Sequence, residues 1–126
     1  MARFNQDIVQ LTKDNTDFRR VILTEKHSQI VLMSVETGED IGEETHKVDQ
    51  VLVFVAGSGE AVLDGEKSQV AANRLVVVPA GTKHNFINTG GEPLKLYTVY
   101  APPEEEEGLV HKDKAEAEAW EKEHGH

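Results

Sequence analysis

The chain has 126 residues, a formal net charge of −10 and no cysteine. This length suggests one domain, and the missing cysteines exclude disulfides and thiolate metal sites. An acidic surface would repel nucleic acid and anionic membranes, no apolar run is long enough to span a bilayer, and no signal segment follows Met1, so we expect a cytoplasmic protein without nucleic-acid or membrane partners.

The first part of the chain is mixed, with a short strand predicted over residues 7–11 and a turn or one helical turn over residues 13–17. From residue 18 to residue 100, short β-rich runs alternate with turns. The predicted strands cover residues 18–24, 28–35, 51–55, 60–63, 68–71, 75–78, 84–88 and 94–100. Asp64-Gly65 is a typical two-residue hairpin turn. Strands at this spacing, with no helix between them, predict an all-β antiparallel sandwich or barrel.

The character of the chain changes after Tyr100. Two prolines and four consecutive glutamates form an acidic linker, and Asp113 is placed to cap a helix over residues 114–122. We therefore divide the chain into a β-barrel over residues 1–101 and an acidic linker with a C-terminal helical tail over residues 102–126.

The acidic run leaves two interpretations of the tail open. Repulsion between the glutamates would keep the linker extended, which lets Leu109, Val110 and Trp120 dock on a barrel wall of this chain or of a partner. A disordered tail is the alternative, given the composition of this segment.

A metal site is indicated by two ligand-rich segments. Pro79 and Gly81 form a turn that delivers His84 at the start of a strand. About thirty-five residues upstream lie Glu44, His46 and Gln50. Alternate side chains of an extended segment share a face, so these four side chains converge if both faces line a barrel interior. Two imidazoles, one carboxylate and one amide oxygen suit a divalent ion such as Zn, Fe, Ni or Mn.

These two segments resemble the two motifs of the cupins. The first motif is carried by Gly38, Glu44, His46, Gln50 and Gly57, and the second by Pro79, Gly81, His84 and Asn88. The resemblance spans residues 28–101. It implies a jelly-roll barrel of six to eight strands, often dimeric, with a metal ion inside. We therefore expect an all-β, antiparallel cupin barrel with a short C-terminal helix.

The chain departs from the usual cupin pattern at three positions. Glu44 stands where the first histidine would be, and Gln50 stands where the glutamate would be, whereas His46 and His84 match. These changes remove the three-histidine set of many family dioxygenases, although two histidines and a carboxylate also form the ligand set of many non-haem iron oxygenases. The leading glycine of the second motif is Asn73 here, which also tolerates the left-handed conformation.

Other interpretations of these residues stay open. The histidines could line a metal-free ligand pocket, as in some sugar-modifying cupins, and Glu44 could be a solvated turn carboxylate. Because no proposed ligand lies beyond His84, we expect metal binding not to depend on the tail. His111 is left without a role.

The expected function is that of a metal-binding cupin that binds or acts on a small polar metabolite, a sugar or a carboxylate, with isomerase-type or lyase-type chemistry. The alternatives are a non-haem iron oxygenase and a non-catalytic small-molecule-binding module. No catalytic residue is assigned, and whether the protein is an enzyme stays open. We also expect a homodimer, because a small barrel has edge strands to cover, with residues 7–11 and 18–24 as candidates.

Overall fold

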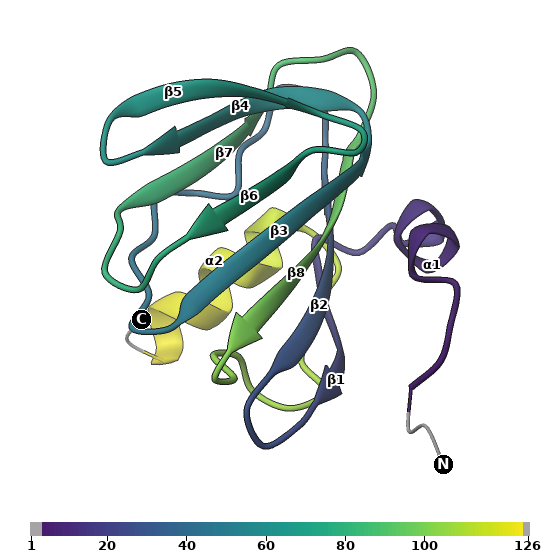
Figure 1. Ribbon diagram of the computed structural model, residues 1–126, viewed down its shortest axis with the longest axis vertical. Helices are drawn as coiled ribbons and strands as arrows, with labels where there is room; N and C mark the ends of the chain where they lie inside the picture. Colours follow the sequence, from purple (N-terminus) through teal and green to yellow (C-terminus); the bar gives the residue numbers. More distant parts are fainter. Residues whose placement is uncertain (1–3, 125–126) are drawn as a thin grey trace.

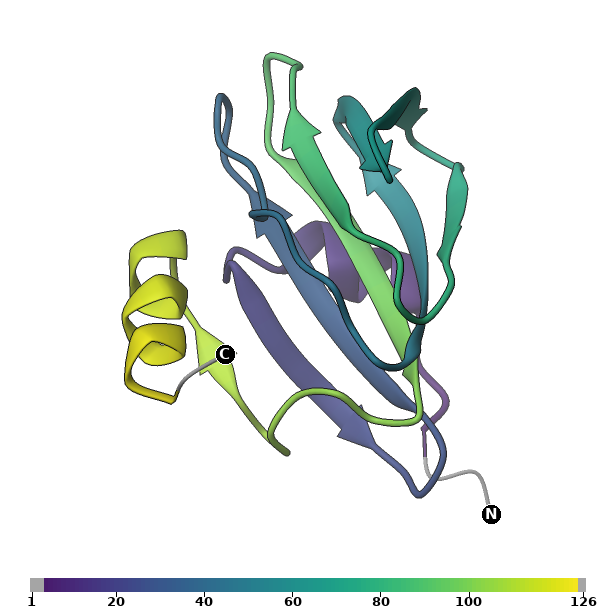
Figure 2. The same ribbon diagram turned by 90° about the vertical axis from the view of Figure 1, so that its left-hand side faces the viewer.

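Two antiparallel sheets face each other in the computed structural model, which describes residues 4–124 (Figure 1). Among these residues, the larger sheet has six strands in the order β6 (Leu75–Val78), β3 (Asp49–Ala56), β8 (Leu94–Ala101), β2 (Gln29–Val35), β1 (Arg19–Thr24) and β9 (Val110–His111). Within the same range, the smaller sheet has three, in the order β5 (Glu66–Ala71), β4 (Ser58–Leu63) and β7 (His84–Asn88). Helices α1 (Ile8–Asp14) and α2 (Lys114–His124) lie outside the sheets (Figure 2). The predicted all-β antiparallel jelly roll with a short C-terminal helix is confirmed.

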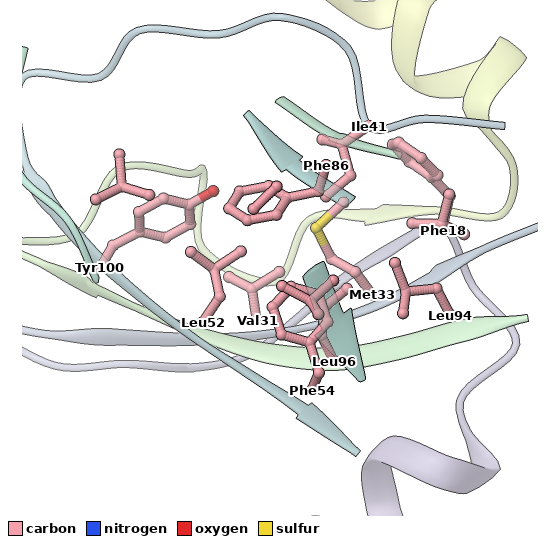
Figure 3. Packing of buried hydrophobic residues seen from close by; sticks show 14 of the residues in the cluster. Phe18, Val31, Met33, Ile41, Leu52, Phe54, Phe86, Leu94, Leu96 and Tyr100 are labelled. Carbon is pink, nitrogen blue, oxygen red and sulfur yellow. The ribbon is translucent and has the colours of Figure 1, made fainter. Parts of the chain in front are cut away.

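Alternating inward side chains fill the space between the sheets. The strand register aligns Phe54, Leu96 and Met33 across the larger sheet, and each is at most 1 % exposed. The ring of Phe54 lies 5.7 Å from the ring of Phe86 on β7, so this pair joins the two sheets. Figure 3 shows the cluster extending from Leu94 at one end to Tyr100 at the other. Burying one such side chain stabilises the fold by about 1.5–3 kcal/mol.

All eight predicted strands form, and their ends move by at most two residues. The predicted strand over residues 7–11 is wrong, because this segment belongs to α1. Asp7 is the N-cap of that helix, and its carboxylate accepts a hydrogen bond from the backbone N–H of Gln10 at 3.1 Å. The candidate edge over residues 18–24 is also wrong, since β1 pairs with β2 on one side and with β9 on the other.

The backbone conformation required of two turn residues is confirmed. Gly81 has a φ of 85°, which lets the chain turn before β7. Asn73 has a φ of 74°, so it adopts the left-handed conformation in place of the usual glycine.

The tail docks on the barrel, as the first of the two interpretations predicts. Strand β9 joins the larger sheet, and Leu109 packs against the apolar core. Asp113 caps α2 through the backbone N–H of Glu116 at 2.8 Å, and Ala117 is 2 % exposed. Val110 is exposed, so its predicted docking is wrong. Neither helix in the described part of the chain has the length and apolar character needed to cross a membrane.

Candidate metal centre

Three of the four predicted ligands meet at one end of the barrel interior. Potential ligand atoms of Glu44, His46 and His84 all lie within 4.8 Å of one another. Both histidines are buried, and the Glu44 side chain is 18 % exposed. Side chains from a loop and from strand β7 thus form a compact group of a kind that can hold a metal ion.

Backbone hydrogen bonds bring the two segments together. Glu44 and His84 form an isolated antiparallel bridge, in which each backbone N–H donates to the carbonyl of the other residue at 2.9 Å. The N–H of Gly81 donates to the carbonyl of His46 at 2.8 Å. The turn that delivers His84 therefore also fixes the backbone of His46, and the two imidazole centroids lie 5.2 Å apart.

The hydrogen bonds of the two imidazoles leave one nitrogen of each ring unused. Nδ1 of His46 lies 3.0 Å from a carboxylate oxygen of Glu104, and Nδ1 of His84 lies 2.8 Å from the carbonyl oxygen of Thr82. Within the described chain, both Nε2 atoms are buried without a hydrogen-bond partner, although Nε2 of His46 lies 3.6 Å from a carboxylate oxygen of Glu44. Such orphaned groups are costly in a protein interior. Two buried imidazole nitrogens with free lone pairs can bind a metal ion, so the residues at this site are suited to hold one.

The fourth predicted ligand, Gln50 on β3, is linked to this group through Tyr100. Its Nε2 donates to the hydroxyl of Tyr100 at 3.3 Å, and the ring of Tyr100 meets the ring of His46 edge-on at 5.4 Å. The amide oxygen of Gln50 is buried and has no hydrogen-bond partner among residues 4–124. The amide oxygen of Gln50 is therefore free to coordinate a metal ion, and its place in the ligand set stays a prediction.

Burial and charge shift the titration of the three side chains. Burial alone would raise the pKa of the Glu44 carboxyl, but its contact with His46 and the charge of Arg19 outweigh burial and hold that pKa below its usual value. Burial lowers the pKa of His84. Burial would also lower the pKa of His46, but Glu44 and Glu104 raise it. At neutral pH Glu44 is therefore an anion and His84 a neutral imidazole, the forms in which these side chains bind metals.

A buried arginine adjoins the same group. The side chain of Arg19 is 2 % exposed, and its guanidinium nitrogens lie 3.7 Å from Glu44, 3.8 Å from Glu105 and 3.6 Å from Glu121. Burial disfavours its charge, but the neighbouring carboxylates outweigh burial and raise the pKa of Arg19. Arg19 is thus a permanent cation that links the site, the acidic linker and α2.

Arg19 and Glu104 were not predicted from the sequence. For Arg19 a signal existed, because alternation along β1 places it two residues from the inward-facing Val21. For Glu104 no local pattern was available, because it approaches His46 from a distant part of the chain. His111 is buried on β9 beside Trp120, outside the three-residue group, with ring centroids 5.6 Å apart.

Two surface clefts differ in their relation to the site. A cleft of about 560 Å³ lies between α1 and β1, and none of the predicted ligands lines it. A second cleft, of about 410 Å³, is lined by His84 together with Asp64 and Lys83. Both volumes are within the range that small-molecule sites occupy, and His84 is the one predicted ligand that lines the second cleft.

The chain is similar in sequence to a known protein family and to several curated proteins. The family model described as Cupin domain matches residues 31–100. The uncharacterized protein YrkC of Bacillus subtilis is 46 % identical over 123 residues, which cover 92 % of this chain and 66 % of that protein. The uncharacterized protein L612 of Acanthamoeba polyphaga mimivirus is 36 % identical over 104 residues, which cover 79 % of this chain and 65 % of that protein. The chain thus spans about two thirds of the length of these curated relatives.

Solved structures show the same architecture. The BH2720 protein from Bacillus halodurans superposes with a TM-score of 0.92 at 42 % identity, covering 94 % of this chain and 95 % of that chain. A protein with a double-stranded β-helix domain from Klebsiella pneumoniae superposes with a TM-score of 0.69 at 19 % identity, covering 90 % of this chain and 100 % of that chain. The second likeness shows the fold alone.

Proposed function

The chain belongs to the cupin family, and from that premise we propose that it is a metal-binding cupin that binds or acts on a small polar metabolite, a sugar or a carboxylate. The observation that carries this proposal is the pair of buried Nε2 atoms, on His46 and His84, that lack hydrogen-bond partners among the described residues beside the anionic Glu44. A fold alone would not assign this role, because one fold hosts many chemistries.

The residues of the chain have distinct parts in this function. His46 and His84 would hold a Zn, Fe, Ni or Mn ion through Nε2, with the Gln50 amide oxygen as a further donor. The bound ion would supply Lewis acidity at a carbonyl, carboxylate or hydroxyl group of the metabolite. Glu44 is either a third ligand or a general base, and its lowered pKa keeps it able to accept a proton at neutral pH. Chemistry of the isomerase or lyase type fits this arrangement.

A second candidate function is that of a non-haem iron oxygenase. The grouping of two histidines with one carboxylate favours it, since that set recurs in iron oxygenases. A non-catalytic small-molecule-binding module is the remaining alternative, and the experiment below distinguishes the three.

We also propose that the protein forms a homodimer through β6. Within residues 4–124, β6 is the terminal strand of the larger sheet, and it carries Leu75 at 59 % exposure and Val77 at 51 % exposure. An edge strand can pair antiparallel with the same strand of a second copy about a two-fold axis, which would cover both side chains.

The metal proposal is tested by elemental analysis of protein purified without a histidine tag. Wild-type protein is expected to carry a stoichiometric divalent ion, and the variant His46→Ala/His84→Ala is expected to carry none while keeping its β-sheet circular dichroism. His27→Ala is the matched control, because His27 is exposed and lies away from the ligand set. Equal metal content in wild type and double variant would refute the proposal.

The reaction type is tested by incubating the metal-loaded protein with a panel of sugars and small carboxylates. Substrate-dependent oxygen uptake with bound iron would identify the oxygenase. Conversion without oxygen uptake would support isomerase or lyase chemistry, and binding without conversion would identify a non-catalytic module.

A further inference from the structure

The acidic segment, residues 102–108, is held against the end of the barrel that carries the candidate metal site. The holding residue is Gln29 on β2, which is fully buried. Its amide oxygen accepts the backbone N–H groups of Glu104 at 3.1 Å and Glu105 at 2.8 Å, and its Nε2 donates to the carbonyl of Glu105 at 2.8 Å. Three hydrogen bonds from one buried side chain give this part of the segment a defined position.

This attachment divides the four consecutive glutamates into two pairs. Glu106 and Glu107 are exposed, whereas Glu104 and Glu105 are partly buried. A carboxylate oxygen of Glu104 lies 3.0 Å from Nδ1 of His46, and Glu105 lies 3.8 Å from Nε of Arg19. Glu104 therefore contacts a predicted ligand and Glu105 contacts the arginine next to the site, whereas the exposed outer pair serves as a control within the same run of sequence.

A carboxylate faces each nitrogen of the His46 ring, and the shorter contact, 3.0 Å from Nδ1 to Glu104 against 3.6 Å from Nε2 to Glu44, favours the tautomer that leaves Nε2 free. A carboxylate can only accept a hydrogen bond, so the neutral ring that it holds carries its proton on Nδ1. The lone pair is then on Nε2, which is buried and lies 3.6 Å from a carboxylate oxygen of Glu44. Metal-binding histidines commonly donate their other N–H to a carboxylate in this way, which fixes the ring and raises its basicity.

Charge gives a second link between the segment and the site. Arg19 has Glu44, Glu105 and Glu121 within 3.6 to 3.8 Å, and Glu104 adjoins the same group. Four carboxylates against one guanidinium leave this cluster net negative. A divalent cation at the histidines would reduce the repulsion among the carboxylates and so favour the docked position of the acidic segment.

We propose that Glu104 is a positioning residue that orients His46 for metal binding, and that docking of the acidic segment and metal binding stabilise each other. This inference rests on the proposed metal-binding function. It differs from the expectation that metal binding is independent of the tail, because that expectation considered only direct ligands. Thermodynamic reciprocity requires that, if the docked segment tightens metal binding, the bound metal tightens docking by the same factor.

The first test is a titration of full-length, untagged protein with Co²⁺, followed by absorption spectroscopy, and with Zn²⁺ against a competing chelator. Glu104→Ala is expected to weaken metal binding by about 10- to 100-fold, the usual cost of losing such a carboxylate, and to change the Co²⁺ spectrum because the ring of His46 is no longer fixed. Glu104→Gln keeps an acceptor oxygen without the charge and should lie between the alanine variant and the wild type. Glu106→Ala and Glu107→Ala are the matched controls and should leave affinity and spectrum unchanged.

The second test measures the reciprocal effect by digesting the protein with a glutamate-specific protease, with and without Zn²⁺. Zinc should slow cleavage within the acidic segment of the wild type and protect Glu104→Ala much less. Equal metal affinity in Glu104→Ala and wild type, with identical Co²⁺ spectra, would overturn this inference and leave the metal-binding function standing. A wild-type protein that binds neither ion would overturn both.

Discussion

The two ends of the barrel interior differ in how completely their side chains are satisfied. At one end Met33, Phe54 and Leu96 lie in register and are buried by apolar neighbours, so they need nothing further. At the other end His46 and His84 are also buried, yet each carries a ring nitrogen without a hydrogen-bond partner in the described chain. The first end stabilises the fold by itself, whereas the second carries an energetic cost that a bound ion would offset.

A polar residue at the apolar end shows that burial alone does not leave groups unsatisfied. Asn88 is 2 % exposed, and its Nδ2 donates to the carbonyls of Val35 and Glu92, while its Oδ1 accepts the N–H of Gly90. Gln50 is buried to the same degree and keeps a free amide oxygen. The satisfied amide of Asn88 thus has a structural role, whereas the free amide oxygen of Gln50 is a candidate for binding.

The largest effect on folding is expected from Phe54→Ala. Removing this ring leaves a cavity between the sheets and should lower the free energy of unfolding by about 3–5 kcal/mol, measured by urea denaturation of metal-free protein. His46→Ala/His84→Ala is the counterpart at the polar end. It removes two unsatisfied nitrogens but also the Nδ1 contacts with Glu104 and Thr82, so it should lower the same free energy by only about 1–2 kcal/mol. Equal losses in the two variants would mean that the two ends do not differ as described.

A smaller effect, on metal affinity, is expected from Gln50→Glu. The substitution adds a negative charge beside Tyr100, whose ring contacts His46. The hydroxyl of Tyr100 can turn to donate to the new carboxylate, because burial raises the pKa of Tyr100 well above its usual value. Binding of Mn²⁺ should tighten on the order of tenfold, as measured by isothermal titration calorimetry. Unchanged or weaker affinity would show that Gln50 does not touch the metal.

The smallest effect on folding is expected on the outer face of the larger sheet. Wild-type protein should show twice the 14.0 kDa chain mass by light scattering. Leu75→Lys/Val77→Lys should give the single-chain mass while changing the stability of each subunit by only about 0.5 kcal/mol, since both side chains are exposed. Val9→Lys/Leu11→Lys, on the exposed face of α1, is the control that should stay dimeric. A wild-type monomer would exclude the proposed dimer.

The parts of the fold that follow local rules could be predicted from the sequence. Strands were recognised by alternation and apolar runs, and Gln50, which strand alternation places toward the interior, is buried. Gly81 and Asn73 were recognised because few residues adopt a positive φ. The grouping of Glu44, His46 and His84 followed from strand periodicity together with the cupin motifs.

Other features could not be predicted because they depend on distant partners. The segment over residues 8–14 is short and has a mixed apolar and polar composition, and the capping hydrogen bond to Asp7 favours a helix. Strand β9 has only two residues, so no periodicity marks it. The approach of Glu104 to His46 depends on Gln29, and no rule for four adjacent glutamates indicates which of them turns inward.

The bridge between Glu44 and His84 has a consequence for how the site can change over time. Backbone atoms hold residues 44 and 84 opposite each other, and the N–H of Gly81 holds residue 46, so the frame does not depend on which side chains these positions carry. A single substitution at position 44 or 46 can therefore exchange one donor atom for another without rebuilding the loop. The backbone frame can therefore accept different ligand sets through single substitutions, and the set with Glu44 in the place of a histidine is one example.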